Sequence, residues 1–126
     1  MNLRRLPALF ALFALAPLLS LAADLAGTWK TEFDSQIGIQ KYTFEFTSEG
    51  DALTGQAAFE NSFGNGKVAL KAIKVDGEKV TFVEEFNFEG QMIPITYTGT
   101  LTDDTMTLHR QVGEFGSEDI VAHRQG

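Results

Sequence analysis

Residues 40–47 read QKYTFEFT, and an aromatic residue stands at every second position from Tyr42 to Phe46. In an extended chain Tyr42, Phe44 and Phe46 fall on one face, and only charged residues and threonine fall on the other. This period of two is typical of a β-strand that buries one face and exposes the other. The stretch therefore predicts a half-buried strand, and the same pattern returns along most of the chain.

Seven further stretches show this alternation, separated by short segments rich in Gly, Asp and Asn. In one of them the alternation changes phase between Leu70 and Ile73, which indicates a β-bulge. No amphipathic helix of useful length is predicted. We expect strands over Gly27–Phe33, Gln40–Thr47, Ala52–Glu60, Lys67–Val75, Lys79–Phe88, Met92–Leu101, Thr105–Val112 and Glu118–Arg124.

Short strands joined by turns predict an all-β fold, an eight-stranded antiparallel up-and-down β-barrel. Closure into a barrel would remove the two exposed edges that an open sheet leaves. A sandwich of two sheets is the alternative architecture.

Composition excludes several classes of protein. The chain has 126 residues, no cysteine and a formal net charge of −7. This length fits one domain. Without cysteine a disulfide framework cannot form, and the chain lacks the surplus of Lys and Arg that a nucleic-acid partner requires. His109 and His123 stand apart without cysteine, so we expect no metal site and no cofactor.

Residues 1–22 resemble a secretory signal peptide, with Arg4 and Arg5 before the apolar stretch Leu6–Leu21 and a small residue, Ala22, at its end. A transmembrane span is the alternative, but it needs about 20 apolar residues, and the stretch Leu6–Leu21 has only 16 residues. We expect cleavage after Ala22, or alternatively after Ala23. Cleavage after Ala22 would leave a single domain over residues 23–126 with a charge of −9, in the periplasm or outside the cell.

Gly27-Thr28-Trp29 at the start of the first strand resembles the G-x-W signature of the calycin superfamily, which includes lipocalins and avidins. The resemblance implies a barrel in which the tryptophan lies near the closed end and a basic residue of the last strand packs across it. Arg124 is the matching residue. The biotin site of avidins is not implied, because Trp29 is the only tryptophan.

A second resemblance covers nearly the whole mature chain. It is similar to a family of small secreted bacterial domains, found alone or appended to secreted hydrolases, which implies a place outside the cytoplasm and no defined catalytic role. The segments that carry this resemblance are Gly27–Lys30, Lys41–Phe44, Leu53–Gly55, Lys74–Gly77 and Tyr97–Gly99.

Two charged residues interrupt the apolar faces. The alternation turns Glu84 and Arg110 inward, together with Tyr97. A turn at Asp103-Asp104 places Tyr97 opposite Arg110, and a turn around Glu89–Met92 places Glu84 opposite Tyr97. The sequence thus predicts one row of three polar groups, in which the Tyr97 hydroxyl joins the carboxylate and the guanidinium. This row is either a structural ion pair or the polar floor of a ligand cavity.

The connecting segments differ between the two ends of the predicted barrel. Tight turns occupy one end, and longer loops such as Asp34–Ile39, Asn61–Gly66 and Gly113–Ser117 occupy the other. Longer loops with aromatic and amide side chains predict the mouth of a cavity. The predicted rim residues are Asn61, Phe63, Gln91 and Phe115.

Three functions fit this pattern. The first is a binding barrel for a small, largely apolar or aromatic molecule with one polar or anionic group, and its expected ligand-binding residues are Glu84, Tyr97, Arg110, Tyr42 and Phe86. The second is a glycan-related accessory module of secreted hydrolases. The third is a small-cavity lyase, isomerase or hydrolase in which Glu84 acts with Arg110, Glu84 being the candidate catalytic residue. A barrel completely filled by its phenylalanines is the structural alternative.

The expected partner is a small molecule or a glycan, with no nucleic acid and, after signal cleavage, no membrane. We expect a monomer or a weak homo-oligomer.

Overall fold

The computed structural model describes residues 25–126, which form nine antiparallel β-strands. The predicted signal peptide and both predicted cleavage positions lie outside these residues. Within the described part of the chain, no helix has the length and apolar character needed to cross a membrane. The strands are β1 (Gly27–Ser35), β2 (Gly38–Glu49), β3 (Ala52–Asn61), β4 (Gly64–Ala69), β5 (Lys71–Asp76), β6 (Lys79–Phe88), β7 (Gln91–Thr102), β8 (Thr105–Val112) and β9 (Gly116–Gln125).

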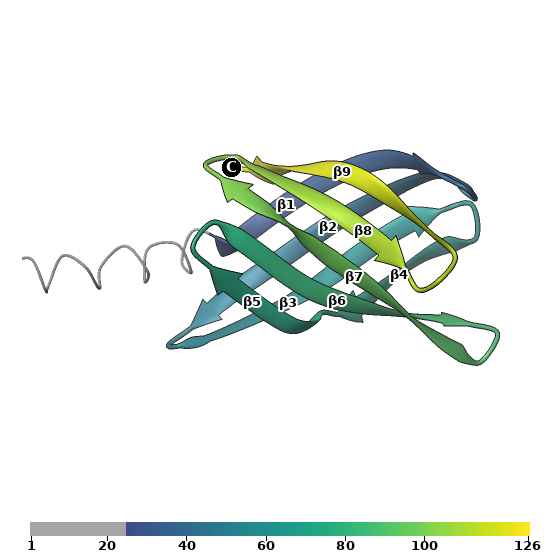
Figure 1. Cartoon of the computed structure of the whole chain (residues 1–126), viewed down its shortest axis with the longest axis horizontal. Helices are drawn as coiled ribbons and strands as arrows, with labels where there is room; N and C mark the ends of the chain where they lie inside the picture. Colours follow the sequence, from purple (N-terminus) through teal and green to yellow (C-terminus); the bar gives the residue numbers. More distant parts are fainter. Residues whose placement is uncertain (1–24) are drawn as a thin grey trace, which may run out of the picture.

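All nine strands belong to one sheet, in the order β4-β3-β2-β1-β9-β8-β7-β6-β5. A single sheet contradicts the two-sheet sandwich. The sheet is strongly curled, so that β6, β7 and β8 cross in front of β1, β2 and β3 (Figure 1). The first and last strands of the chain pair with each other, and Trp29 of β1 lies opposite Arg124 of β9.

The prediction of eight strands in a closed barrel was wrong. The expected strand Lys67–Val75 is divided into β4 and β5, which form the two edges of the sheet, so the sheet is not closed. The division falls where the sequence changes phase: Ala72 has a positive φ of 52°, and the register of β5 with β6 shifts between Lys71 and Lys74. The buried Leu70 between the two strands donates its amide to the Gly55 carbonyl of β3 at 2.9 Å. Before Leu70, β4 pairs with β3, and after it β5 pairs with β6.

The inward faces of the strands form one core. Its largest fully buried side chains include Trp29, Phe44, Phe82 and Tyr97, and the rings of Phe82 and Tyr97 stack with centroids 4.7 Å apart. The predicted pairing of β7 with β8 is confirmed, because Tyr97 lies opposite Arg110. Close approach of these two strands requires Gly99, since a Cβ there would lie 1.9 Å from the Thr107 carbonyl oxygen.

The predicted pairing of β6 with β7 was wrong by two residues. Glu84 lies opposite Ile95, and Tyr97 lies opposite Phe82. The turn consists of Glu89 and Gly90 alone, both with positive φ, whereas a turn over Glu89–Met92 was expected, so Phe88 pairs with Gln91. A shift of two residues leaves each side chain on its predicted face.

The predicted long loops were also wrong. The strands continue toward the predicted mouth, so the turn between β1 and β2 contains only residues 36–37 and the turn between β3 and β4 only residues 62–63. The Ser35 hydroxyl donates to the Gly38 carbonyl at 2.9 Å across the first of these turns. Both ends of the sheet therefore carry short turns, and the two ends differ in side chains and not in loop length.

Candidate functional site

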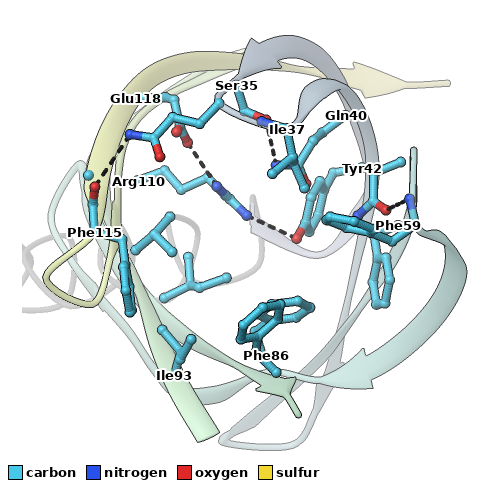
Figure 2. A pocket seen from close by; sticks show the side chains of 17 residues that line it. Ser35, Ile37, Gln40, Tyr42, Phe59, Phe86, Ile93, Arg110, Phe115 and Glu118 are labelled. Carbon is cyan, nitrogen blue, oxygen red and sulfur yellow. Dashed lines mark hydrogen bonds and ion pairs between the residues drawn. The ribbon is translucent and has the colours of Figure 1, made fainter. Parts of the chain in front are cut away.

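A pocket of about 270 Å³ opens at the end of the sheet that was predicted to form the mouth. Figure 2 shows the strands running around it, with side chains from several strands pointing into the space between them. The polar side chains that line it are Ser35, Gln36, Gln40, Tyr42, Asn61, Arg110 and Glu118, and the apolar ones are Ile37, Phe59, Phe63, Phe86, Phe88, Ile93, Ile95, Val112 and Phe115, with Gly116 completing the wall.

Exposed apolar side chains surround the opening. Phe63 and Phe115 are 71% and 63% exposed, and both line the pocket, as do Phe88 and Ile37. Asn61, Phe63 and Phe115 thus lie at the pocket as predicted, whereas Gln91 is not among its lining residues. The opening of the pocket is therefore surrounded by exposed apolar side chains.

Arg110 of β8 forms the polar floor of this pocket, although only 3% of it is exposed. Its Nη1 donates to Glu118 Oε1 at 2.8 Å and forms an ion pair with that carboxylate. Its Nε donates to the Tyr97 hydroxyl at 3.0 Å and its Nη2 to the Tyr42 hydroxyl at 3.1 Å. In Figure 2 the guanidinium extends between Glu118 and Tyr42.

Glu84 lies beneath the floor and is 1% exposed. One of its carboxylate oxygens accepts from the Tyr42 hydroxyl and the other from the Tyr97 hydroxyl, each at 2.8 Å. Each tyrosine oxygen thus accepts a hydrogen bond from Arg110 and donates one to Glu84. The predicted arrangement, a tyrosine hydroxyl between the carboxylate and the guanidinium, is present, with Tyr42 as a second bridge. Neither Glu84 nor Tyr97 lines the pocket.

Burial controls the acid–base properties of this network. Loss of water raises the pKa of Glu84 above its ordinary value, against the opposing effect of the two tyrosine hydroxyls and Arg110. Burial and the nearby Glu84 carboxylate raise the pKa of Tyr97 and of Tyr42, so both tyrosines stay protonated and act as donors to Glu84. Burial alone would lower the pKa of Arg110, but the tyrosines and Glu118 outweigh it and raise that pKa.

The arginine also packs on aromatic rings. Its guanidinium carbon lies 5.1 Å from the centre of the Phe33 ring and 5.2 Å from that of Tyr42. Contact with ring faces favours a cation in a site with little water. The guanidinium is therefore fixed by hydrogen bonds on its edge and by rings beside it.

Sequence reasoning missed Glu118, the direct partner of Arg110. Glu118 begins the predicted last strand, and a turn pairing β8 with β9 places it opposite Arg110. Register across this hairpin is one signal that would have found it. Gln40 was likewise not predicted to face inward: its side chain is buried, with 5% exposed, and it donates to the Ser35 hydroxyl at 3.0 Å.

The pair predicted from the G-x-W signature lies on the other side of the core. The Arg124 guanidinium carbon is 4.3 Å from the centre of the buried Trp29 ring, and its Nη1 donates to the Ala26 carbonyl at 3.0 Å. The Trp29 indole nitrogen donates to the Leu25 carbonyl at 3.0 Å. Gly27 lies close by, because a Cβ there would be 3.1 Å from Arg124. None of these residues lines the pocket.

Comparison of the chain with protein-family models, with curated proteins and with solved structures finds no match. Among residues 25–126, no group of three His, Asp or Glu side chains is placed to hold a metal ion.

Proposed function

We propose that this protein binds a small, largely apolar or aromatic molecule whose single polar group faces Arg110. The observation that carries the proposal is a buried, fixed guanidinium at the floor of an apolar pocket that opens to solvent. Binding sites for small molecules are concave, mainly apolar and equipped with few polar groups that set orientation. The alternative of a completely filled barrel does not account for this pocket.

The volume limits the ligand. The pocket volume of about 270 Å³ lies just below the range of about 300–1,000 Å³ that is typical of ligand sites. One aromatic ring or a short aliphatic chain with a polar head fits this space. The ring would contact Phe86, Ile93 and Val112, and the polar head would reach Arg110.

Glu84 serves this function as a positioning residue. It holds both tyrosine hydroxyls, and these hold the Nε and Nη2 edge of the guanidinium. Because it does not line the pocket, a direct acid–base role toward a ligand is less well supported than a binding role.

The glycan alternative relies on the exposed Phe63 and Phe115 as stacking platforms, and retention on insoluble polysaccharides would favour it over the binding of a free small molecule.

Titration of the ¹⁵N-labelled protein with single-ring aromatic compounds, followed by NMR, tests the proposal. We expect saturable shifts of the amide signals of Phe86, Arg110 and Val112. These shifts should weaken in Val112→Phe, because the larger side chain occupies part of the space proposed for the ring of the ligand. Thr96→Phe is the matched control, since it adds the same ring at an exposed position of β7.

Two results would count against binding in this pocket. One is the absence of saturable shifts with every compound. The other is binding that Val112→Phe leaves intact while its folded spectrum is preserved.

We also propose that residues 1–22 direct export of the domain. We further propose that the domain is related to calycins through Gly27, Trp29 and Arg124, and that it binds its ligand at the open end of the sheet, as they do in their barrels. The position of the pocket away from the Trp29–Arg124 pair supports this relation. Mass spectrometry of the protein secreted by a bacterial host tests export, with a mature N-terminus at Ala23 or Asp24 as the expected result. Retention of Met1 in the secreted fraction would contradict cleavage.

A further inference from the structure

We infer that the pocket selects an uncharged polar head that both accepts and donates hydrogen bonds, such as a carboxamide, over a carboxylate of the same shape. This inference rests on the proposed function and narrows its ligand class. It follows from the way in which Arg110 and Glu118 stand together at the floor.

Arg110 keeps hydrogen-bond donors for a ligand. A guanidinium has five N–H groups, and the hydrogen bonds to Tyr97, Tyr42 and Glu118 use three of them. One N–H remains on Nη1 and one on Nη2. Because Arg110 lines the pocket, a carbonyl or hydroxyl oxygen that enters the pocket can accept from these donors.

Glu118 places an acceptor beside these donors. Its Oε1 accepts from Arg110, and its side chain is 18% exposed and lines the pocket. Its second oxygen remains available to a ligand N–H or O–H. A polar head with one acceptor and one adjacent donor, such as a primary amide, matches the Arg110–Glu118 pair on both sides.

The local charge disfavours an anion. Arg110 contributes one positive charge and Glu118 one negative charge, and Glu84 contributes a second negative charge when it is ionised. The sum is therefore zero or −1, whichever protonation state Glu84 adopts. A carboxylate would meet Arg110 only beside Glu118, and repulsion between two close anions in a poorly solvated site is strong. A cationic head offers no acceptor, so it would lie beside the like charge of Arg110 and leave the two remaining N–H groups unpaired.

Benzamide, benzoate and benzamidine provide the test, because they share one shape and carry charges of zero, −1 and +1. NMR titration should give benzamide at least about tenfold tighter binding than either ion, the equivalent of 1.4 kcal/mol. In Glu118→Gln the local charge rises by one, so the ratio of benzoate to benzamide affinity should rise about tenfold. Asp119→Asn makes the same change of net charge on an exposed side chain of the same strand and should leave the ratio unchanged.

Benzoate that binds the wild-type protein as tightly as benzamide would overturn the inference and leave the proposed function standing. A ratio that Glu118→Gln does not alter would overturn it as well. If none of the three compounds binds, the proposed function fails for ligands of this size and the inference fails with it. The wild-type ratio needs no variant, so the inference is tested even if Glu118→Gln does not fold.

Discussion

Removal of a single hydroxyl group from either bridging tyrosine measures how the polar floor is held. Tyr97→Phe and Tyr42→Phe make the same chemical change between the same two partners, Arg110 and Glu84. In each wild-type bridge the oxygen accepts from the guanidinium at 3.0 or 3.1 Å and donates to the carboxylate at 2.8 Å. The bridges differ in access to water, since Tyr42 lines the pocket and Tyr97 has no exposed surface.

This difference sets the magnitudes. A hydrogen bond to a charged group contributes about 1.5–3 kcal/mol, and a buried group left unpaired costs about 1–3 kcal/mol. Tyr97→Phe leaves the Nε–H of Arg110 and one Glu84 oxygen unpaired and beyond the reach of water, so we expect it to lower the free energy of unfolding by about 3–4 kcal/mol. After Tyr42→Phe a water molecule from the pocket can replace the hydroxyl, so we expect a loss of about 1–2 kcal/mol.

Urea unfolding at pH 7 provides the assay, with the fluorescence of the single, fully buried Trp29 as the signal. The two m-values should agree, because both variants bury the same rings. A Tyr42→Phe variant as unstable as Tyr97→Phe would refute the reasoning from water access. Losses below about 0.5 kcal/mol for both would refute the bridges themselves.

Three further predictions concern titration and packing. The pKa of Glu84 is raised in the folded state, so its protonated form adds stability that is fully present below the ordinary value of 4.5 and is lost as the pH rises through the raised pKa. The free energy of unfolding at pH 4 minus that at pH 8 should therefore be smaller in Glu84→Gln than in the wild type, and an unchanged value would contradict the raised pKa. The hydrogen bond to Asp119 raises the pKa of the exposed His109 above 6.5. An NMR titration should therefore show a lower pKa of His109 in Asp119→Asn than in the wild type. An unchanged pKa would exclude the contact between the two side chains in solution. Gly99→Ala places a Cβ against the Thr107 carbonyl and should lower the free energy of unfolding in urea by about 3 kcal/mol or more. In Gly116→Ala the new Cβ meets only the flexible end of Gln36, so the free energy of unfolding should fall by less than about 1 kcal/mol. Similar losses in the two variants would contradict the close approach of β7 and β8.

The faces of the strands could be predicted from the sequence because side-chain direction depends only on parity. Tyr42, Glu84, Tyr97 and Arg110 all lie inward as predicted, and all are buried. The two-residue error in pairing β6 with β7 did not change this result, since a shift of two residues preserves the face. Parity therefore identified the polar group in the core before its exact neighbours were known.

Positions of turns could not be predicted in the same way, because they depend on backbone conformations that the residue types disfavour. Glu89 and Ala72 both adopt positive φ, which non-glycine residues rarely do. At Glu89 this shortens a turn, and at Ala72 it accompanies the division of the predicted fourth strand into the two edges of the sheet. Glu118 could have been found by parity, because it lies on the same face of β9 as the buried Ile120 and Ala122.

In the proposed complex the pocket holds an uncharged polar head against Arg110 and Glu118. Intermolecular nuclear Overhauser effects between benzamide and the ¹³C-labelled protein test this claim most directly. We expect contacts from the benzamide ring to Phe86 and Val112, and from its amide protons to the side-chain protons of Glu118. Contacts confined to the outer surface of the sheet, or a ring bound with its amide directed away from Arg110 toward solvent, would contradict it.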